Sequence, residues 1–139
     1  MRLANLAITT AQAAQVAASA LFRDRAPAHV LLHANFTYGS GGTSADAWVQ
    51  TSLVGGTTWC DVANFHFTTA SARKFFNLSS MTPVATQATP TDGSLAANTC
   101  VDGLVGPLWR VKYTTVGTYA GSTTLAVHIV GDGQAQAIQ

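Results

Sequence analysis

The four histidines are the first residues to consider for chemistry, because imidazole serves both as a metal ligand and as a general base. His29 and His33 fall on one face of an expected strand, but at that spacing they lie roughly 13 Å apart, too far to share a metal ion. His66 and His128 each stand alone in other expected strands. The chain has no H-E-x-x-H motif, no cysteine cluster and no aspartate-rich calcium loop. The sequence therefore predicts ordinary polar or core histidines, with no metal site and no other cofactor.

The carboxylates and nucleophiles do not form a recognisable catalytic set either. Five of the six acidic residues, all of them aspartates, lie in expected loops or beside glycine, where aspartate favours turns. Asp61 is the exception, but a glycosidase needs a second carboxylate at a defined separation, and no second residue stands out. There is no G-x-S-x-G motif, and the glycine-rich stretch "GSGG" (39–42) lacks the lysine and helix start of a phosphate loop. We therefore expect that the protein is not an enzyme.

The stretch "AWVQTSLVGGTTWCDV" (47–62) predicts a β-hairpin that turns at Gly55-Gly56, because primed hairpin turns need positive φ. This register places Gln50 opposite Asp61, Thr51 opposite Cys60 and Val49 opposite Val62. Side chains alternate between the two faces of a strand, so one face is mostly small or apolar and is expected to be core. It comprises Val49, Thr51, Leu53, Thr58, Cys60 and Val62. The opposite face is polar and carries both tryptophans. It comprises Trp48, Gln50, Ser52, Trp59, Asp61 and Ala63.

Three interpretations of the tryptophan face remain open. Another segment of the same chain covers it, another subunit packs against it, or its indoles form a platform that stacks sugar rings. Aromatic residues are enriched at the centres of protein interfaces, which favours the second interpretation as a functional hypothesis. The candidate interface residues are Trp48, Gln50, Trp59, Asp61, and Leu21 and Phe22 from the N-terminal segment.

The N-terminal residues 1–27 are expected to be an extended arm or to hold a short alanine-rich helix. Such a helix would run from Thr10, a possible N-cap, to about Phe22. Polar residues interrupt the apolar stretch, so a signal peptide is a weaker reading. Because the segment has few large apolar residues, we expect it to dock on a neighbouring subunit.

Composition points to one β-rich domain that is covered in an assembly. Of the 139 residues only 9% are charged, there is no glutamate, and the net charge is +1. This charge gives no reason to expect nucleic-acid binding, and no apolar run reaches the ~18 residues of a membrane span. A surface with so few charges is easier to understand if partners cover much of it. Cys60 and Cys100 are either buried free thiols or one disulfide.

Strand patterns separated by turn signals fill residues 28–131. The clearest is "LWRVKYTTVG" (108–117), where Trp109, Val111 and Tyr113 alternate with Arg110 and Lys112. Seven or eight antiparallel strands predict a single β-sandwich or jelly-roll-like domain, all-β in class. Residues 132–139 are expected to be a C-terminal tail. The other expected strands cover 29–39, 47–54, 57–62, 73–80 and 123–131. Residues 64–69 either extend the second hairpin strand or form a strand that follows it.

The phrases "VQTSLVGGTTWCDVANFHFTTA" and "RVKYTTVGTYAGSTTL" resemble a group of small virion structural proteins of tailed bacteriophages. The resemblance covers residues 29 to about 130. It implies a virion component, assembled in the host cytoplasm, with no catalytic residues to carry over. We expect a capsid decoration (cement) protein that binds the major capsid protein and copies of itself. The alternatives are a head–tail connector or tail component, and a carbohydrate-binding module.

Overall fold

The computed structural model describes residues 1–22, 25–132 and 135–138, and this part of the chain contains strands and no helix. Two very short strands, β4 and β9, pair with each other beside the two main sheets. The strands are β1 (Arg2–Ala7), β2 (Gln12–Phe22), β3 (His29–Thr37), β4 (Ser40–Gly41), β5 (Ser44–Ser52), β6 (Cys60–Phe67), β7 (Ala72–Ser79), β8 (Leu108–Val116), β9 (Tyr119–Ala120), β10 (Thr124–Gly131) and β11 (Ala135–Ile138).

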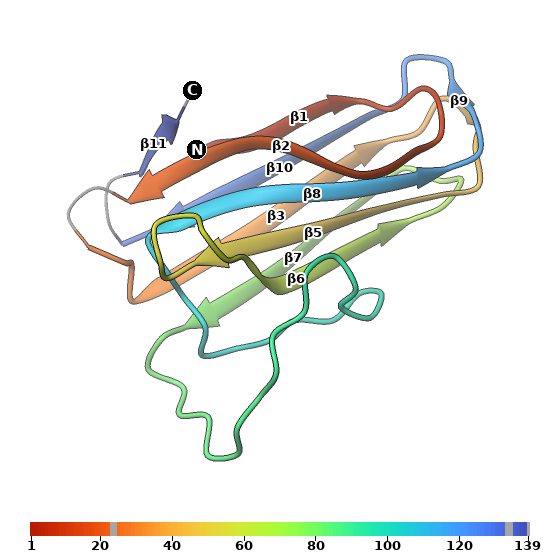
Figure 1. Cartoon of the computed structure of the whole chain (residues 1–139). Coiled ribbons are helices and arrows are strands. Elements are labelled where there is room, and N and C mark those ends of the chain that lie inside the picture. The colour runs from red at the N-terminus through yellow and green to blue at the C-terminus, as the bar shows by residue number, and fades with distance from the viewer. Residues whose placement is uncertain (23–24, 133–134, 139) are drawn as a thin grey trace.

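Two antiparallel sheets form the sandwich (Figure 1). One has the strand order β1-β10-β3-β7 and the other the order β11-β2-β8-β5-β6. Apart from the β5–β6 hairpin, each connection between the eight long strands passes from one sheet to the other. This alternation is typical of a jelly roll, which buries one face of each sheet against the other. The expected all-β, sandwich-like fold is confirmed.

The core lies between the two sheets and follows the two-residue period of the strands. In β3 the inward residues Val30, Leu32, Ala34 and Phe36 are at most 2% exposed, as their alternation in the sequence predicts. Strand β8 contributes Trp109, which is fully buried and donates a hydrogen bond from Nε1 to the Gly106 carbonyl oxygen at 2.8 Å. The large apolar residues at every second position of these strands therefore hold the two sheets against each other.

The expectation of an N-terminal arm or helix is wrong. Strand β1 pairs with β10, and β2 lies between β11 and β8 in the other sheet. The side chains of Leu3, Ile8 and Phe22 are no more than 3% exposed and belong to the core. Alanine favours helices in isolation, but tertiary packing overrides this weak preference where a strand can complete a sheet.

The C-terminal residues differ from the expected tail as well. Strand β11 extends the five-stranded sheet, because its backbone pairs with β2 from Ala135 opposite Phe22 to Ile138 opposite Ser19. β2 is thus an inner strand of this sheet.

A long connection, which we call the 80–107 segment, links β7 to β8 and projects beyond the sheets before it returns (Figure 1). On its return it runs along β6. Two amides of β6 donate to carbonyl oxygens of the segment, Asp61 to Thr91 at 2.8 Å and Asn64 to Thr99 at 2.9 Å. In the opposite direction, the amide of Val101 donates to the Val62 carbonyl oxygen at 2.8 Å. These bonds occupy hydrogen-bonding groups that an exposed edge strand would otherwise offer to another chain.

Candidate interaction surfaces

The β5–β6 hairpin has the expected turn, with a bulge that the sequence did not reveal. Gly55 and Gly56 have φ of 67° and 86°, and the Thr57 amide donates to the Val54 carbonyl oxygen at 3.3 Å. The predicted pairs Thr51–Cys60 and Gln50–Asp61 are present.

The register then shifts, so that Val49 lies opposite Ala63 instead of Val62. Trp48 consequently lies opposite Asn64, and Val62 and Ala63 are both buried. Leu53, expected in the core, is 59% exposed because the sheet ends at Ser52, before the hairpin tip.

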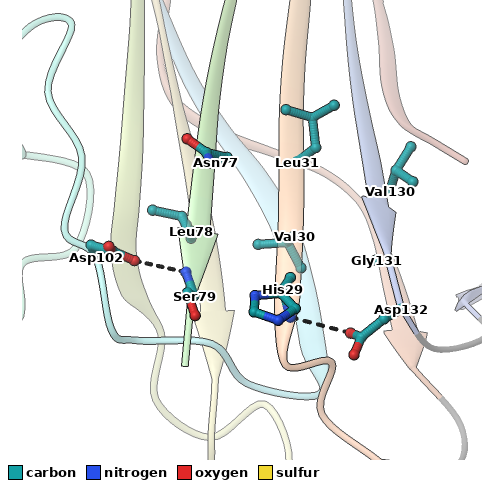
Figure 2. Close-up of a pocket in the computed structure, with 10 residues that line it drawn as sticks. All are labelled: His29, Val30, Leu31, Asn77, Leu78, Ser79, Asp102, Val130, Gly131 and Asp132. Atoms are coloured by element: carbon teal, nitrogen blue, oxygen red, sulfur yellow. Dashed lines mark hydrogen bonds between the residues drawn. The ribbon is translucent and has the colours of Figure 1, made fainter. Parts of the chain in front are cut away.

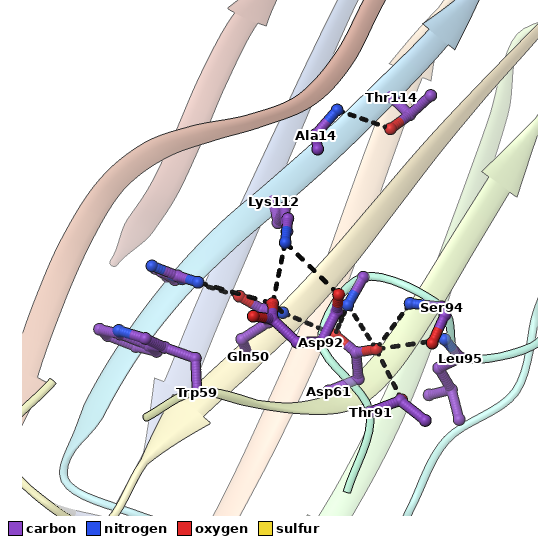
Figure 3. A network of polar contacts seen from close by, with 12 residues as sticks. Ala14, Gln50, Trp59, Asp61, Thr91, Asp92, Ser94, Leu95, Lys112 and Thr114 are labelled. Atoms are coloured by element: carbon purple, nitrogen blue, oxygen red, sulfur yellow. Dashed lines mark hydrogen bonds and ion pairs between the residues drawn. The ribbon is translucent and has the colours of Figure 1, made fainter. Parts of the chain in front are cut away.

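Asp61 anchors the 80–107 segment to the outer face of the five-stranded sheet (Figure 3). Its Oδ2 accepts hydrogen bonds from the Thr91 hydroxyl at 2.7 Å and from the amides of Ser94 and Leu95 at 3.0 and 3.1 Å. The Gly93 amide lies 2.8 Å from both carboxylate oxygens. Burial alone would raise the pKa of Asp61, but hydrogen bonds from Gln50, Thr91 and the segment's amides outweigh it and lower the pKa. Asp61 is therefore an ionised structural group.

A second set of polar contacts extends from Gln50 toward solvent. Its Nε2 donates to Asp61 Oδ1 and to Asp92 Oδ1, both at 2.7 Å, and its Oε1 accepts from Arg110 Nε at 2.7 Å. Lys112 Nζ lies 2.9 Å from Asp92 Oδ1. The basic side chains of β8 are thus paired within the chain. Hydrogen bonds from Gln50 and Lys112 lower the pKa of Asp92.

The two tryptophans on this face contact their own chain. Trp48 Nε1 donates to the Leu95 carbonyl oxygen at 3.0 Å, and Trp59 Nε1 donates to that of Gly56 at 2.9 Å. The guanidinium of Arg110 lies 4.4 Å from the centre of the Trp59 ring. Both indoles are half-buried. Much of the tryptophan face is therefore covered by another segment of the same chain, as the first of the three interpretations holds.

The structure separates the candidate interface residues into buried ones and half-buried ones. Gln50 and Asp61 are 0% and 2% exposed beneath the 80–107 segment, and Phe22 is 2% exposed in the core, so the expectation that these three meet a partner is corrected. Leu21 is half-buried on β2, opposite Leu108. For Leu21, Trp48 and Trp59, contact with another subunit stays a prediction.

Trp59→Ala should lower the free energy of unfolding by about 1–2 kcal/mol, because it removes a half-buried ring and its contact with Arg110. Trp109→Ala is the matched comparison, and there a fully buried ring is lost, with an expected cost of about 3–5 kcal/mol. Urea unfolding of both variants measures the difference. Equal losses would show that Trp59 is as much a core residue as Trp109.

Both cysteines are free thiols. Cys60 is half-buried and Cys100 is exposed, so the expected full burial is wrong, and a disulfide is not formed. Partial loss of contact with water raises the pKa of both thiols. The charge of Asp61 adds to the effect for Cys60, and that of Asp102 for Cys100.

Two of the histidines meet across strands, which their sequence positions did not suggest. The rings of His33 on β3 and His128 on β10 are 6.0 Å apart, and His66 Nδ1 lies 2.9 Å from Asp46 Oδ1 elsewhere on the molecule. Within residues 1–22, 25–132 and 135–138, no three His, Cys or Asp side chains are grouped closely enough to hold a metal ion.

The outer face of the β1-β10-β3-β7 sheet, which we call the open face, carries large exposed apolar side chains. Phe75 is 68% exposed, Val130 57% and Leu31 42%. Strand register places Val130 beside Leu31, and Phe75 lies beside His33 in the next outward row. Leu31, Asn77 and Val130 help to line a shallow hollow of about 550 Å³ at one end of the sheet. Figure 2 shows these three side chains on neighbouring strands. This apolar surface is the second candidate site.

The fold and these surfaces define an antiparallel β-sandwich domain whose two outer faces differ. One is covered over β5 and β6 by the 80–107 segment, and the other is open. Comparisons with family models, curated proteins and solved structures find no match to this chain. Within the described residues, no helix is long and apolar enough to cross a membrane.

Proposed function

We propose that this chain is a structural protein of a tailed-bacteriophage virion, and specifically a capsid decoration protein that attaches through its open face. The two sequence phrases that resemble such virion proteins support the proposal. So does the composition, because a surface with few charges suits a protein that partners cover. The protein acts passively, since whatever binds only the assembled shell shifts the equilibrium toward assembly.

The observation that carries the proposal is the apolar surface of Leu31, Phe75 and Val130. Contiguous apolar patches on soluble proteins commonly mark interaction sites, and a flat sheet face suits a broad protein surface better than a small ligand. The outer face of the other sheet has less surface free for a partner, because the 80–107 segment already covers Gln50 and Asp61. Attachment therefore uses the open face in preference to the tryptophan face.

The alternative of a carbohydrate-binding module is not favoured by the geometry. A sugar platform needs a free aromatic ring face and polar groups beside it. Arg110 lies over the Trp59 ring, and both indole N–H groups donate within the chain. A head–tail connector or tail component remains the alternative, and it differs from a decoration protein in copy number.

Quantitative mass spectrometry of purified virions tests the assignment. A decoration protein should be present in hundreds of copies per particle, whereas a connector follows the six- or twelvefold symmetry of the neck. About six or twelve copies would make the chain a connector, and its absence from virions would reject the proposal.

Binding to shells assembled without this chain tests the open face. Phe75→Ser should weaken binding about 30-fold or more, as loss of an aromatic anchor commonly does. Met81→Ser is the matched control, because Met81 is 75% exposed on the 80–107 segment and outside the strands of the open face. If Met81→Ser weakens binding and Phe75→Ser does not, attachment runs through that segment instead.

A further inference from the structure

We propose that the partner of the open face is a protein surface with an apolar centre and an acidic rim. This inference rests on the proposed function, so the partner is the outer surface of the shell. It adds the chemistry by which that surface is recognised, which the apolar residues alone do not specify.

One row of outward side chains crosses all four strands of the open face. Strand register aligns Arg2 on β1 with His128 on β10, His128 with His33 on β3, and His33 with Phe75 on β7. Arg73, also exposed, lies two residues before Phe75 on the edge strand. The two arginines therefore stand on opposite edges of the sheet, with the apolar and histidine side chains between them.

These arginines have no internal counter-charge. Among the described residues, neither Arg2 nor Arg73 forms an ion pair, whereas Arg110 and Lys112 on the other sheet both lie beside Asp92. An exposed cation that its own chain leaves unmatched on an apolar face is suited to meet an anion on the partner.

The carboxylates nearest the open face keep their negative charge but stand away from the row. Asp132 follows His128 by four residues, and Asp102 binds Ser79, four residues after Phe75, which is roughly 13 Å along a strand. Figure 2 shows Asp102 and Asp132 on opposite sides of the hollow, Asp102 beside β7 and Asp132 just after β10. Asp102 Oδ1 accepts from the Ser79 amide at 2.7 Å, and Asp132 Oδ1 accepts from the amides of Ala28 and His29 at 2.7 and 3.2 Å. Asp102 therefore holds the end of β7 in place, and Asp132 holds the start of β3. Burial lowers the pKa of His128, and the charges of His33 and Arg2 lower it further, consistent with a positive potential in the row.

The same observations argue against two other occupants. A second copy packed face to face by twofold symmetry would bring a cationic surface against itself, which like charges disfavour. A nucleic acid binds mainly through many phosphate contacts, but this face has two arginines around an apolar centre and the chain has a net charge of +1. A protein partner with acidic groups fits the face better than either.

The test measures the affinity of the full chain for shells assembled without it, at 50 and 300 mM NaCl. Arg2→Gln and Arg73→Gln should each weaken binding about three- to tenfold at low salt, and less at high salt, where screening is stronger. Arg25→Gln is the control for net charge, because Arg25 is exposed in the β2–β3 connection and not in a strand of the open face. Melting temperatures of all variants should match the unmodified chain, since the three side chains are exposed.

The outcomes separate this inference from the proposed function. If the unmodified chain binds shells and both arginine variants bind equally well at low salt, the inference of an acidic partner is wrong. The proposed decoration role is then unaffected. No binding of the unmodified chain to shells overturns both. If sedimentation velocity at about 10 µM detects a dimer, and Phe75→Ser abolishes it, the occupant of the open face is a second copy of this chain. Binding to a 40-base-pair DNA duplex that the arginine variants lose would identify a nucleic acid. Either of these last results also overturns the inference.

Discussion

Deletion of residues 1–22 should abolish the cooperative unfolding transition of this protein. The deletion removes β1 from one sheet and β2 from the interior of the other. It also removes the buried side chains of Leu3, Ile8 and Phe22 and leaves the hydrogen-bonding edges of β8 and β10 unpaired. Thermal unfolding followed by circular dichroism measures the result, and we expect a broad, non-cooperative change.

Two single substitutions on β2 test whether its buried side chains contribute to this stability. Phe22→Ala should lower the free energy of unfolding by about 3–5 kcal/mol, because it opens a cavity in the core. Val16→Ala, on the same strand but at a side chain that is 50% exposed, should change it by no more than about 0.5 kcal/mol. A truncated protein that keeps a sharp transition would show that β1 and β2 are peripheral to the fold.

Asp61→Ala should release the 80–107 segment and lower the free energy of unfolding by about 3 kcal/mol. The substitution leaves the amides of Gly93, Ser94 and Leu95 and the side-chain amide of Gln50 without their acceptor. Each buried donor without a partner costs about 1–3 kcal/mol, although water reaches those on the released segment and reduces the total. Limited proteolysis should cut the segment in the variant much faster than in the unmodified chain.

Asp92→Ala is the control for Asp61→Ala, because the Asp92 side chain is 54% exposed and its removal should cost less than about 1 kcal/mol. Acid should reproduce part of the effect of Asp61→Ala. Because the folded state lowers the pKa of Asp61, its contribution is present above its unfolded pKa, and it is lost as pH falls through the folded pKa. If Asp61→Ala and Asp92→Ala have equal stability and proteolysis rates, Asp61 does not anchor the segment.

The sequence alone determined the class of fold and the faces of its clearest strands. In β3, β8 and β10 large apolar residues recur at every second position, and the structure buries the residues that this period selects, such as Phe36, Trp109 and Leu125. The Gly55-Gly56 turn was also readable, because a pair of glycines readily adopts the positive φ that primed hairpin turns need. These features depend on neighbours in the chain, so local patterns are sufficient to predict them.

Tertiary structure alone decided the rest, because the contacts concerned join residues far apart in the sequence. Residues 1–22 become strands only because β8 and β10 offer them edges, over 80 residues away. Asp61 is buried because the 80–107 segment returns over it, and one bulge at the β5–β6 hairpin moves Trp48 to a new partner. The row formed by Arg2, His128, His33 and Phe75 exists only once four strands lie in register, since no two of these residues are near each other in the chain.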